Sequence, residues 1–416
     1  MVFQPTDGSN ARWRSPALFT PAWRAKKSLP TGVIVASYVR DTMRPVQRSR
    51  DVVTRQAATC RLVALVGLGV ATLLVVGCQR PPNQVPAWEL DVPTSDAGFQ
   101  LRLPKFPVPY AHEEQNCFFV RVPDLANGQD FWVDRVQMAT STGSHHLNVF
   151  RVRTIVDLDP AAGSPVKIGA YDGTAVYGHG DYLNSPCWQS ANWADWPLVA
   201  NTQSPLANGP YTDWQLPDNV AIRFTPGEML MVQAHYVNSS VQPTPIDAEV
   251  GINFYRTANP EPIELGTLFA TQQSIRICQS DPPPTFTGTC RFPGAVTISA
   301  ANGHFHSRGR ELSMYVWDGM STTHPPESDQ FYDNVYWNDA PMTTGIERPV
   351  AAGGGVWWDC SYQWSPPVGG CDAVNAKDPE HAGDCCYVFG GTTDLGEHCN
   401  IFVYYYPKLS TDVFCN

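Results

Sequence analysis

Basic residues are scarce over most of this chain, and their scarcity excludes one large class of function. The 416 residues hold 28 Lys and Arg against 39 Asp and Glu. Residues 1–78 contain 11 of the basic and 3 of the acidic residues, which leaves 17 against 36 and a net charge of −19 for the rest. Because nucleic-acid binding depends on basic patches, we expect no nucleic-acid partner.

Long apolar runs are also few. Residues 62–77 form one uninterrupted run of 16 after several arginines, and no later run approaches the length of about 20 that a membrane span needs. Such a run is typical of a signal peptide. Translation from Met43 would give a signal peptide of ordinary length. The run ends in LVVGC, which resembles a bacterial lipobox with Cys78 as the lipid-bearing residue. We therefore expect export and a lipid anchor at the bacterial cell envelope, with Gln79 favouring the outer membrane. An uncleaved membrane anchor is the alternative.

C-x-x-C pairs are absent from the sequence, which argues against a zinc–thiolate site. Cysteine itself is not rare, since ten follow Cys78, at positions 117, 187, 278, 290, 360, 371, 385, 386, 399 and 415. An even number of cysteines in an exported chain indicates disulfides. Their irregular spacing leaves the pairing open.

No 3.6-residue apolar period persists after residue 85, so helices are not expected. The sequence instead repeats short apolar or alternating runs, such as FWVDRVQMA, MLMVQAHYV and VGINFY, between Gly, Pro, Asn and Asp. These runs predict an all-β chain of antiparallel strands in sandwich or jelly-roll form. About 330 residues suit two sandwiches better than one. The prolines of residues 256–264 predict the boundary between them.

Histidine is the most informative residue type. Six of the ten histidines fall in four short apolar segments, namely His145, His146, His235, His304, His306 and His398. Neutral imidazole is the commonest protein ligand for copper and zinc. Because residues i and i+2 of a strand share a face, His304 and His306 would present two nitrogens to one metal. The adjacent pair could do so only at a strand start or a β-bulge. A lone histidine such as His235 is more often hydrogen-bonded than metal-bound, so the order of the four segments carries the prediction.

Six segments occur in the order NCFFVRVP, HHLNVF, LPDNVAIRFTPGEMLMVQAHY, GHFHSRGRELSMYV, EHCNIFVYYYP and TDVFC. Over residues 110–416 they resemble the copper type II, ascorbate-dependent monooxygenases, the family of peptidylglycine α-hydroxylating monooxygenase and dopamine β-monooxygenase. The resemblance implies two tandem antiparallel β-sandwich domains that face each other across a solvent-filled cleft, with one copper in each. Residues 1–78 would be the extension and signal peptide and 79–109 a tether, followed by domains over 110–258 and 259–416.

The resemblance also implies a role for each histidine. His145, His146 and His235 would bind an electron-transfer copper, and Gln233 matches a glutamine beside the last of these ligands. The oxygen-activating copper would be bound by His304, His306 and His398. The implied disulfides are Cys117–Cys187, Cys290–Cys415 and Cys360–Cys399, which leaves Cys278, Cys371, Cys385 and Cys386 for two more.

Two departures from the family bear on function. The family has methionine in a segment like EMCN, where this chain has EHCN and His398. Imidazole holds Cu(II) better than a soft thioether does, so the copper potential should be lower. Peptide-hydroxylating members use an arginine and a tyrosine where this chain has Asn302 and Phe402, so we do not expect a peptidylglycine substrate.

The sequence thus favours a copper-dependent monooxygenase. It would use two copper ions, O2 and an electron donor such as ascorbate on a small organic substrate. One alternative is a lipid-anchored protein that binds or delivers copper without catalysis. The other is an adhesion or carbohydrate-binding module in which the histidines bind zinc structurally. His398 favours the copper-binding alternative, whereas the five other ligands, distributed over both domains, favour the enzyme.

Overall fold

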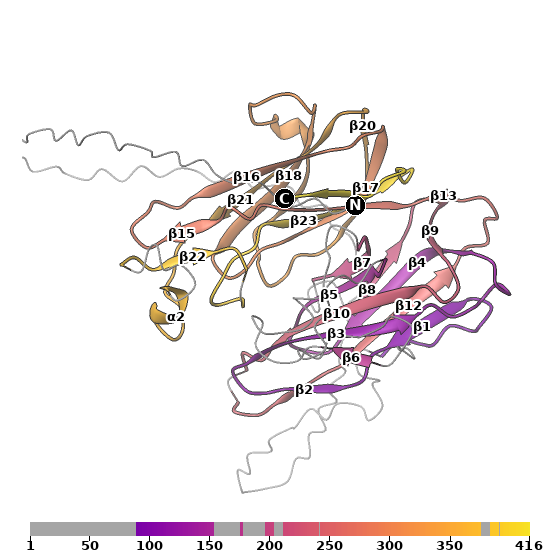
Figure 1. Ribbon diagram of the computed structural model, residues 1–416, viewed down its shortest axis with the longest axis horizontal. Helices are drawn as coiled ribbons and strands as arrows, with labels where there is room; N and C mark the ends of the chain where they lie inside the picture. The colour runs from indigo at the N-terminus through magenta and orange to yellow at the C-terminus, as the bar shows by residue number, and fades with distance from the viewer. Residues whose placement is uncertain are drawn as a thin grey trace, which may run out of the picture. The chain divides into compact units, whose positions relative to one another are not determined.

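The computed structural model describes residues 89–153, 175–177, 196–203, 211–240, 242–375, 383–390 and 392–416. All of them belong to one compact unit, Pro81–Asn416. In these ranges the regular structure is almost entirely β, together with the 3-10 helix η3 (Glu327–Asp329) and the helix α2 (Asp372–Asn375). No helix among these residues is long and apolar enough to cross a membrane. The chain is therefore an all-β protein of several antiparallel sheets (Figure 1).

Two sheets are built from residues 98–264 (Figure 1). The first has the order β1 (Gly98–Arg102), β12 (Val250–Arg256), β4 (Phe131–Thr140), β9 (Val220–Phe224) and β13 (Ile263–Glu264), with β8 (Tyr211–Gln215) also paired to β4. The second has the order β6 (Ala175–Tyr177), β3 (Glu113–Arg121), β10 (Met229–Val237), β5 (Ser144–Arg151) and β7 (Leu198–Thr202). A ribbon of β2 (Phe106–Val108) and β11 (Ile246–Ala248) accompanies them. All pairings are antiparallel except that of β13 with β9.

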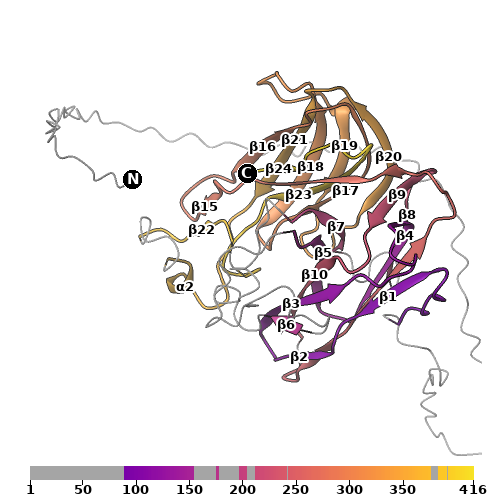
Figure 2. The same ribbon diagram turned by 45° about the vertical axis from the view of Figure 1, so that its right-hand side comes forward.

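Two further sheets are built from residues 266–415 (Figure 2). The third sheet has the order β20 (Thr343–Val350), β17 (Val296–His304), β23 (Asn400–Tyr406), β14 (Gly266–Thr271) and β24 (Val413–Cys415). The fourth has the order β16 (Thr285–Arg291), β21 (Gly355–Tyr362), β18 (Gly309–Trp317) and β19 (Gln330–Asn334). β15 (Arg276–Cys278) and β22 (Cys386–Val388) pair to form a two-stranded ribbon.

Each pair of sheets encloses a hydrophobic core. In the first core, Phe118 and Met231 of the second sheet join Phe254 of the first. In the second core, Ile298 of the third sheet joins Trp358 of the fourth. Burial of side chains of this size contributes about 1.5–3 kcal/mol each. These cores fix the strands from which the histidines project.

Strand β23 takes part in both cores. Its alternate residues Ile401, Val403 and Tyr405 pack into the second core, whereas Phe402 and Tyr404 pack into the first. Burial on both faces explains why NIFVYYY is nearly continuously apolar instead of alternating. The third sheet therefore packs directly against the first half of the described chain.

The ends of the first half differ from the prediction. The range 79–109, predicted as a tether, contains β1 and β2. Phe99 and Leu101 alternate along β1 and are buried in the first core, which anchors the segment to β12. The predicted boundary, residues 256–264, lies between β12 and β14, but β13 within it joins the first sheet.

Candidate metal centre and adjoining cavity

The adjacent histidines lie at the β-bulge that their sequence requires. In the pairing of β10 with β5, His235 is opposite His146, and the next pair is Tyr236 with Ser144. His145 is thus the extra residue of the bulge, and both imidazoles turn to the same side. The ring centroids of His145 and His146 are 5.3 Å apart, and that of His235 lies 5.0 and 4.9 Å from them.

The other three histidines meet at the end of the third sheet. His304 is the last residue of β17, and His306 lies just beyond it, while the intervening Phe305 is buried in the second core. His398 precedes β23, the neighbour of β17. Its ring centroid is 4.3 Å from that of His306 and 5.1 Å from that of His304. HFH is therefore not wholly a strand, although its alternation places both histidines on one side.

All six rings form one buried cluster. The ring of His145 lies 5.0 Å from that of His304 and 5.5 Å from that of His306, and His146 lies 5.0 Å from His304. The resemblance implied a solvent-filled cleft between two copper sites. The histidines contact one another in this structure because β23 and β17 pack against the first half of the chain.

Five of these imidazoles are held in the form that can bind a metal. Burial, reinforced by the neighbouring imidazoles, lowers the pKa of His145, His146, His304 and His398 well below the ordinary value of 6.5. Burial likewise lowers the pKa of His306 to about 4. Neutral rings offer a nitrogen lone pair at neutral pH.

The cluster also contains nitrogens that protein groups leave unsatisfied. Within the described residues, His145 Nε2, His146 Nδ1 and His306 Nε2 are buried and have no hydrogen-bond partner. Ligand atoms of His145, His146 and His304 lie within 4.8 Å of one another, and so do those of His304, His306 and His398. Buried polar groups without partners are costly, and a soft or borderline divalent metal would satisfy this donor set. His304 belongs to both groups.

Neutral amides orient two of the rings. Gln233 Oε1 lies 3.1 Å from His146 Nε2 and accepts a hydrogen bond of 2.9 Å from Asn148 Nδ2. Gln203 Oε1 lies 2.9 Å from His304 Nδ1. For His146 the amide oxygen leaves Nδ1 for a metal, whereas Nε2 of His304 lies 3.0 Å from Nδ1 of His398. Gln233 was found from the resemblance, whereas no motif marks Gln203.

Glu113 is a third orienting group that sequence reasoning missed. Its Oε2 lies 3.0 Å from His235 Nε2, and its carboxylate accepts a hydrogen bond of 3.1 Å from the Thr393 backbone N–H. Burial alone would raise the pKa of Glu113, but the hydrogen bonds with His235 and Thr393 outweigh it and lower the pKa to about 2. Glu113 therefore connects a histidine of β10 to the loop that carries His398. Its only sequence signal is its position at the start of β3.

Glu113→Gln should weaken metal binding by the cluster about 10- to 100-fold, because carboxylate partners of ligand histidines usually contribute this much. Copper titration against a competing chelator would measure the change. Glu114→Gln, the neighbour on the opposite face of β3, is the matched control. Equal affinities in the two variants would show that Glu113 does not position His235.

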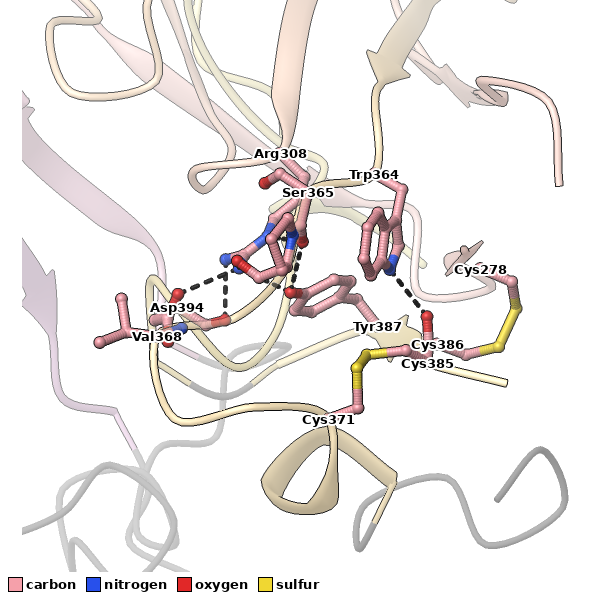
Figure 3. The surroundings of a disulfide bond; sticks show 11 residues. Cys278, Arg308, Trp364, Ser365, Val368, Cys371, Cys385, Cys386, Tyr387 and Asp394 are labelled. Atoms are coloured by element: carbon pink, nitrogen blue, oxygen red, sulfur yellow. Dashed lines mark hydrogen bonds and ion pairs between the residues drawn. A yellow bond between two sulfur atoms is a disulfide. The ribbon is translucent and has the colours of Figure 1, made fainter. Parts of the chain in front are cut away.

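The loop that carries His398 is held by a buried arginine (Figure 3). Arg308 donates 2.6 Å to the Tyr387 hydroxyl, 2.7 Å to the Asp394 backbone oxygen and 3.0 Å to Asp394 Oδ1. Glu397 accepts the backbone N–H groups of His306 at 2.8 Å and of Arg308 at 2.7 Å. Burial raises the pKa of Glu397 to about 8 in spite of these donors. The HFHSR turn and the GEHC loop are thereby tied together beside the cluster.

Disulfides add covalent constraints in the same region. The structure contains Cys290–Cys415 and Cys360–Cys399, the pairs that the resemblance implied. The remaining cysteines form Cys278–Cys386 and Cys371–Cys385 (Figure 3). Cys117 is also disulfide-bonded, while Cys187 and the predicted lipidation site Cys78 lie outside the described residues. Cys360–Cys399 fixes the residue directly after His398.

A cavity of about 250 Å³ adjoins the cluster and is lined in part by His146, His304 and His398. Phenylalanines and neutral amides make up much of the rest of its wall. Clefts of this kind, apolar with a few placed polar groups, are typical of small-molecule sites. A molecule in the cavity would contact the imidazole cluster directly.

Comparisons with known proteins add little to this geometry. No protein-family model matches the sequence, and no curated protein matches it either. Among solved structures, the major capsid protein P2 of bacteriophage PM2 aligns at 10% identity over 74% of this chain and 96% of its own, with a TM-score of 0.28. A chain from the structure of broad bean stain virus aligns at 8% identity over 81% of this chain and 98% of its own length, with a TM-score of 0.24. At these TM-scores, fold and function must be argued from this chain's own residues.

Proposed function

We propose that this protein is a copper-dependent monooxygenase that hydroxylates a C–H bond of a small organic substrate, with O2 and a one-electron reductant such as ascorbate. The observation that supports the proposal most strongly is the juxtaposition of six buried histidines with a cavity of about 250 Å³. Metal ligands alone would suit storage or transport. A cavity against the same imidazoles gives a second molecule access to the metal.

The resemblance implies two copper ions, and the proposal assigns the six histidines to them. His145, His146 and His235 would hold one ion, and His304, His306 and His398 the other. Copper, when bound, supplies the one-electron redox chemistry that oxygen activation requires. The chain's own residues hold imidazoles in fixed orientations through Gln233, Gln203 and Glu113. Burial of the cluster excludes bulk water from the reacting centre.

The proposal extends to architecture and location. The two pairs of sheets would be tandem β-sandwiches of jelly-roll type, over about residues 98–264 and 266–415. The disulfides suit an oxidising compartment. Export through the segment that ends at Cys78, and a lipid anchor at the bacterial cell envelope, complete the proposal.

The second candidate is a lipid-anchored protein that binds or delivers copper without catalysis. Its support is His398, because a third imidazole stabilises Cu(II) where the family has a thioether. The contact of all six rings in one buried cluster also suits a closed storage site. The cavity is the feature that this candidate leaves without a role.

One experiment separates the two candidates. Purified protein should bind close to two coppers per chain, and His235→Ala should remove one of them. With ascorbate, the copper-loaded protein should consume O2, and its rate should rise with a C–H substrate. One copper per chain in the unmodified protein would contradict the two-ion proposal. Two coppers without any O2 uptake would favour the binding protein.

The character of His398 gives a separate prediction. His398→Met should lower the Cu(II) affinity of the site that His398 helps to form. It should also raise the reduction potential of the copper there, because a thioether favours Cu(I). The ion held by His145, His146 and His235 should keep its potential. A redox titration followed by electron paramagnetic resonance would resolve the two ions, with the half-exposed His324→Met as control. An unchanged potential would remove His398 from the ligand set.

A further inference from the structure

The cavity beside the histidines has a wall that is strongly aromatic. Phe150 of β5, Phe269 of β14, Phe402 of β23 and Phe414 of β24 line it together. The rings of Phe269 and Phe402 are stacked, with centroids 5.1 Å apart and an interplanar angle of 8°. Phe414 lies 5.6 Å from Phe269 at a tilt of 56°. Such a wall favours an apolar, ring-sized molecule.

The polar part of the wall carries no formal charge. None of the described side chains that line the cavity is an Asp, Glu, Lys or Arg, and its polar side chains are amides, a threonine hydroxyl and imidazoles. A carboxylate or ammonium group would lose its hydration there without gaining an ionic partner, which is costly. The wall therefore selects against charged molecules.

The size of the cavity limits the molecule. A cavity of about 150 Å³ lined by apolar residues is enough to bind benzene. At about 250 Å³, this cavity has room for one six-membered ring and a short side group. A peptide would not fit within it.

We infer that the cavity receives a neutral, single-ring apolar molecule. This inference names the substrate class and, in that respect, rests on the proposed monooxygenase function. Binding itself depends only on the wall of the cavity and can be tested without copper.

Four probes of similar size test the inference, namely benzyl alcohol, toluene, benzoate and benzylamine. Calorimetry and ligand-observed NMR on the metal-free full chain should detect binding of both toluene and benzyl alcohol. Benzoate and benzylamine should bind at least about 100-fold more weakly. Tightest binding of either charged probe would overturn the inference.

Variants locate the binding. Phe414→Trp should fill the cavity and weaken the binding of benzyl alcohol at least about tenfold. The control is Phe286→Trp, which changes a partly buried ring of β16 outside the cavity and should leave the binding unchanged. Unchanged binding in Phe414→Trp would place the probe elsewhere and overturn the inference.

The two proposals fail in different ways. Benzyl alcohol binding without copper uptake would defeat the monooxygenase and leave the cavity assignment intact. Two coppers and ascorbate-dependent O2 uptake, without binding of any neutral ring, would support the enzyme and defeat the assignment.

Discussion

His304→Ala should weaken copper binding at both positions of the cluster, although the residue belongs to only one of the two triads that the sequence suggests. Its ligand atom lies within 4.8 Å of those of His145 and His146, and also of those of His306 and His398. Groups that only hydrogen-bond to a metal ligand already change the metal affinity 10- to 100-fold. Loss of His304 itself should therefore lower the affinity for the second ion at least about 100-fold. The affinity for the first ion should also fall measurably.

A copper titration with a competing chelator would measure both affinities. His306→Ala is the matched comparison, because His306 belongs to one group only, and His324→Ala controls for loss of a histidine outside the cluster. Identical losses in His304→Ala and His306→Ala would show that His304 serves a single ion.

Arg308→Met should destabilise the protein by about 1.5–3 kcal/mol, because the hydrogen bonds that the buried guanidinium donates would be lost. The side chain is 1% exposed, and its guanidinium also lies 4.1 Å above the ring of Tyr387. Methionine keeps much of the volume but leaves the Asp394 carboxylate and backbone oxygen without their donor. Thermal unfolding in the metal-free state would report the loss as a lower Tm.

Arg310→Met is the control, because this exposed arginine lies two residues along and should change stability by less than about 0.5 kcal/mol. Because Arg308 holds the loop before His398, its variant should also bind the second copper less tightly at temperatures below Tm. Equal Tm values for the two variants would mean that the buried network contributes nothing net.

The local part of the candidate centre could be predicted from sequence. Two adjacent histidines can serve one site only at a strand start or a bulge, and the structure has a bulge at His145. Alternation in HFH likewise placed His304 and His306 on one side. Such inferences hold because they depend on strand geometry alone, which is set within a few residues.

The contact between the two sets of histidines could not be predicted. It depends on the packing of the third sheet against the first core, where the ring of Tyr404 lies 4.6 Å from that of Trp214 and its hydroxyl donates 2.5 Å to Asn201 Oδ1. No pattern in the sequence pairs residues about 200 positions apart. Glu113 was missed for the same reason, since its partners His235 and Thr393 are distant in the chain.

The double burial of β23 has a consequence for how this chain can be divided. A cut between residues 257 and 265 would leave Phe402 and Tyr404 facing water on one fragment and Trp214 on the other. Neither fragment would then be a self-sufficient module. Recombination or engineering that exchanges one half for a homologous half must therefore also match the apolar surface on the far side of β23.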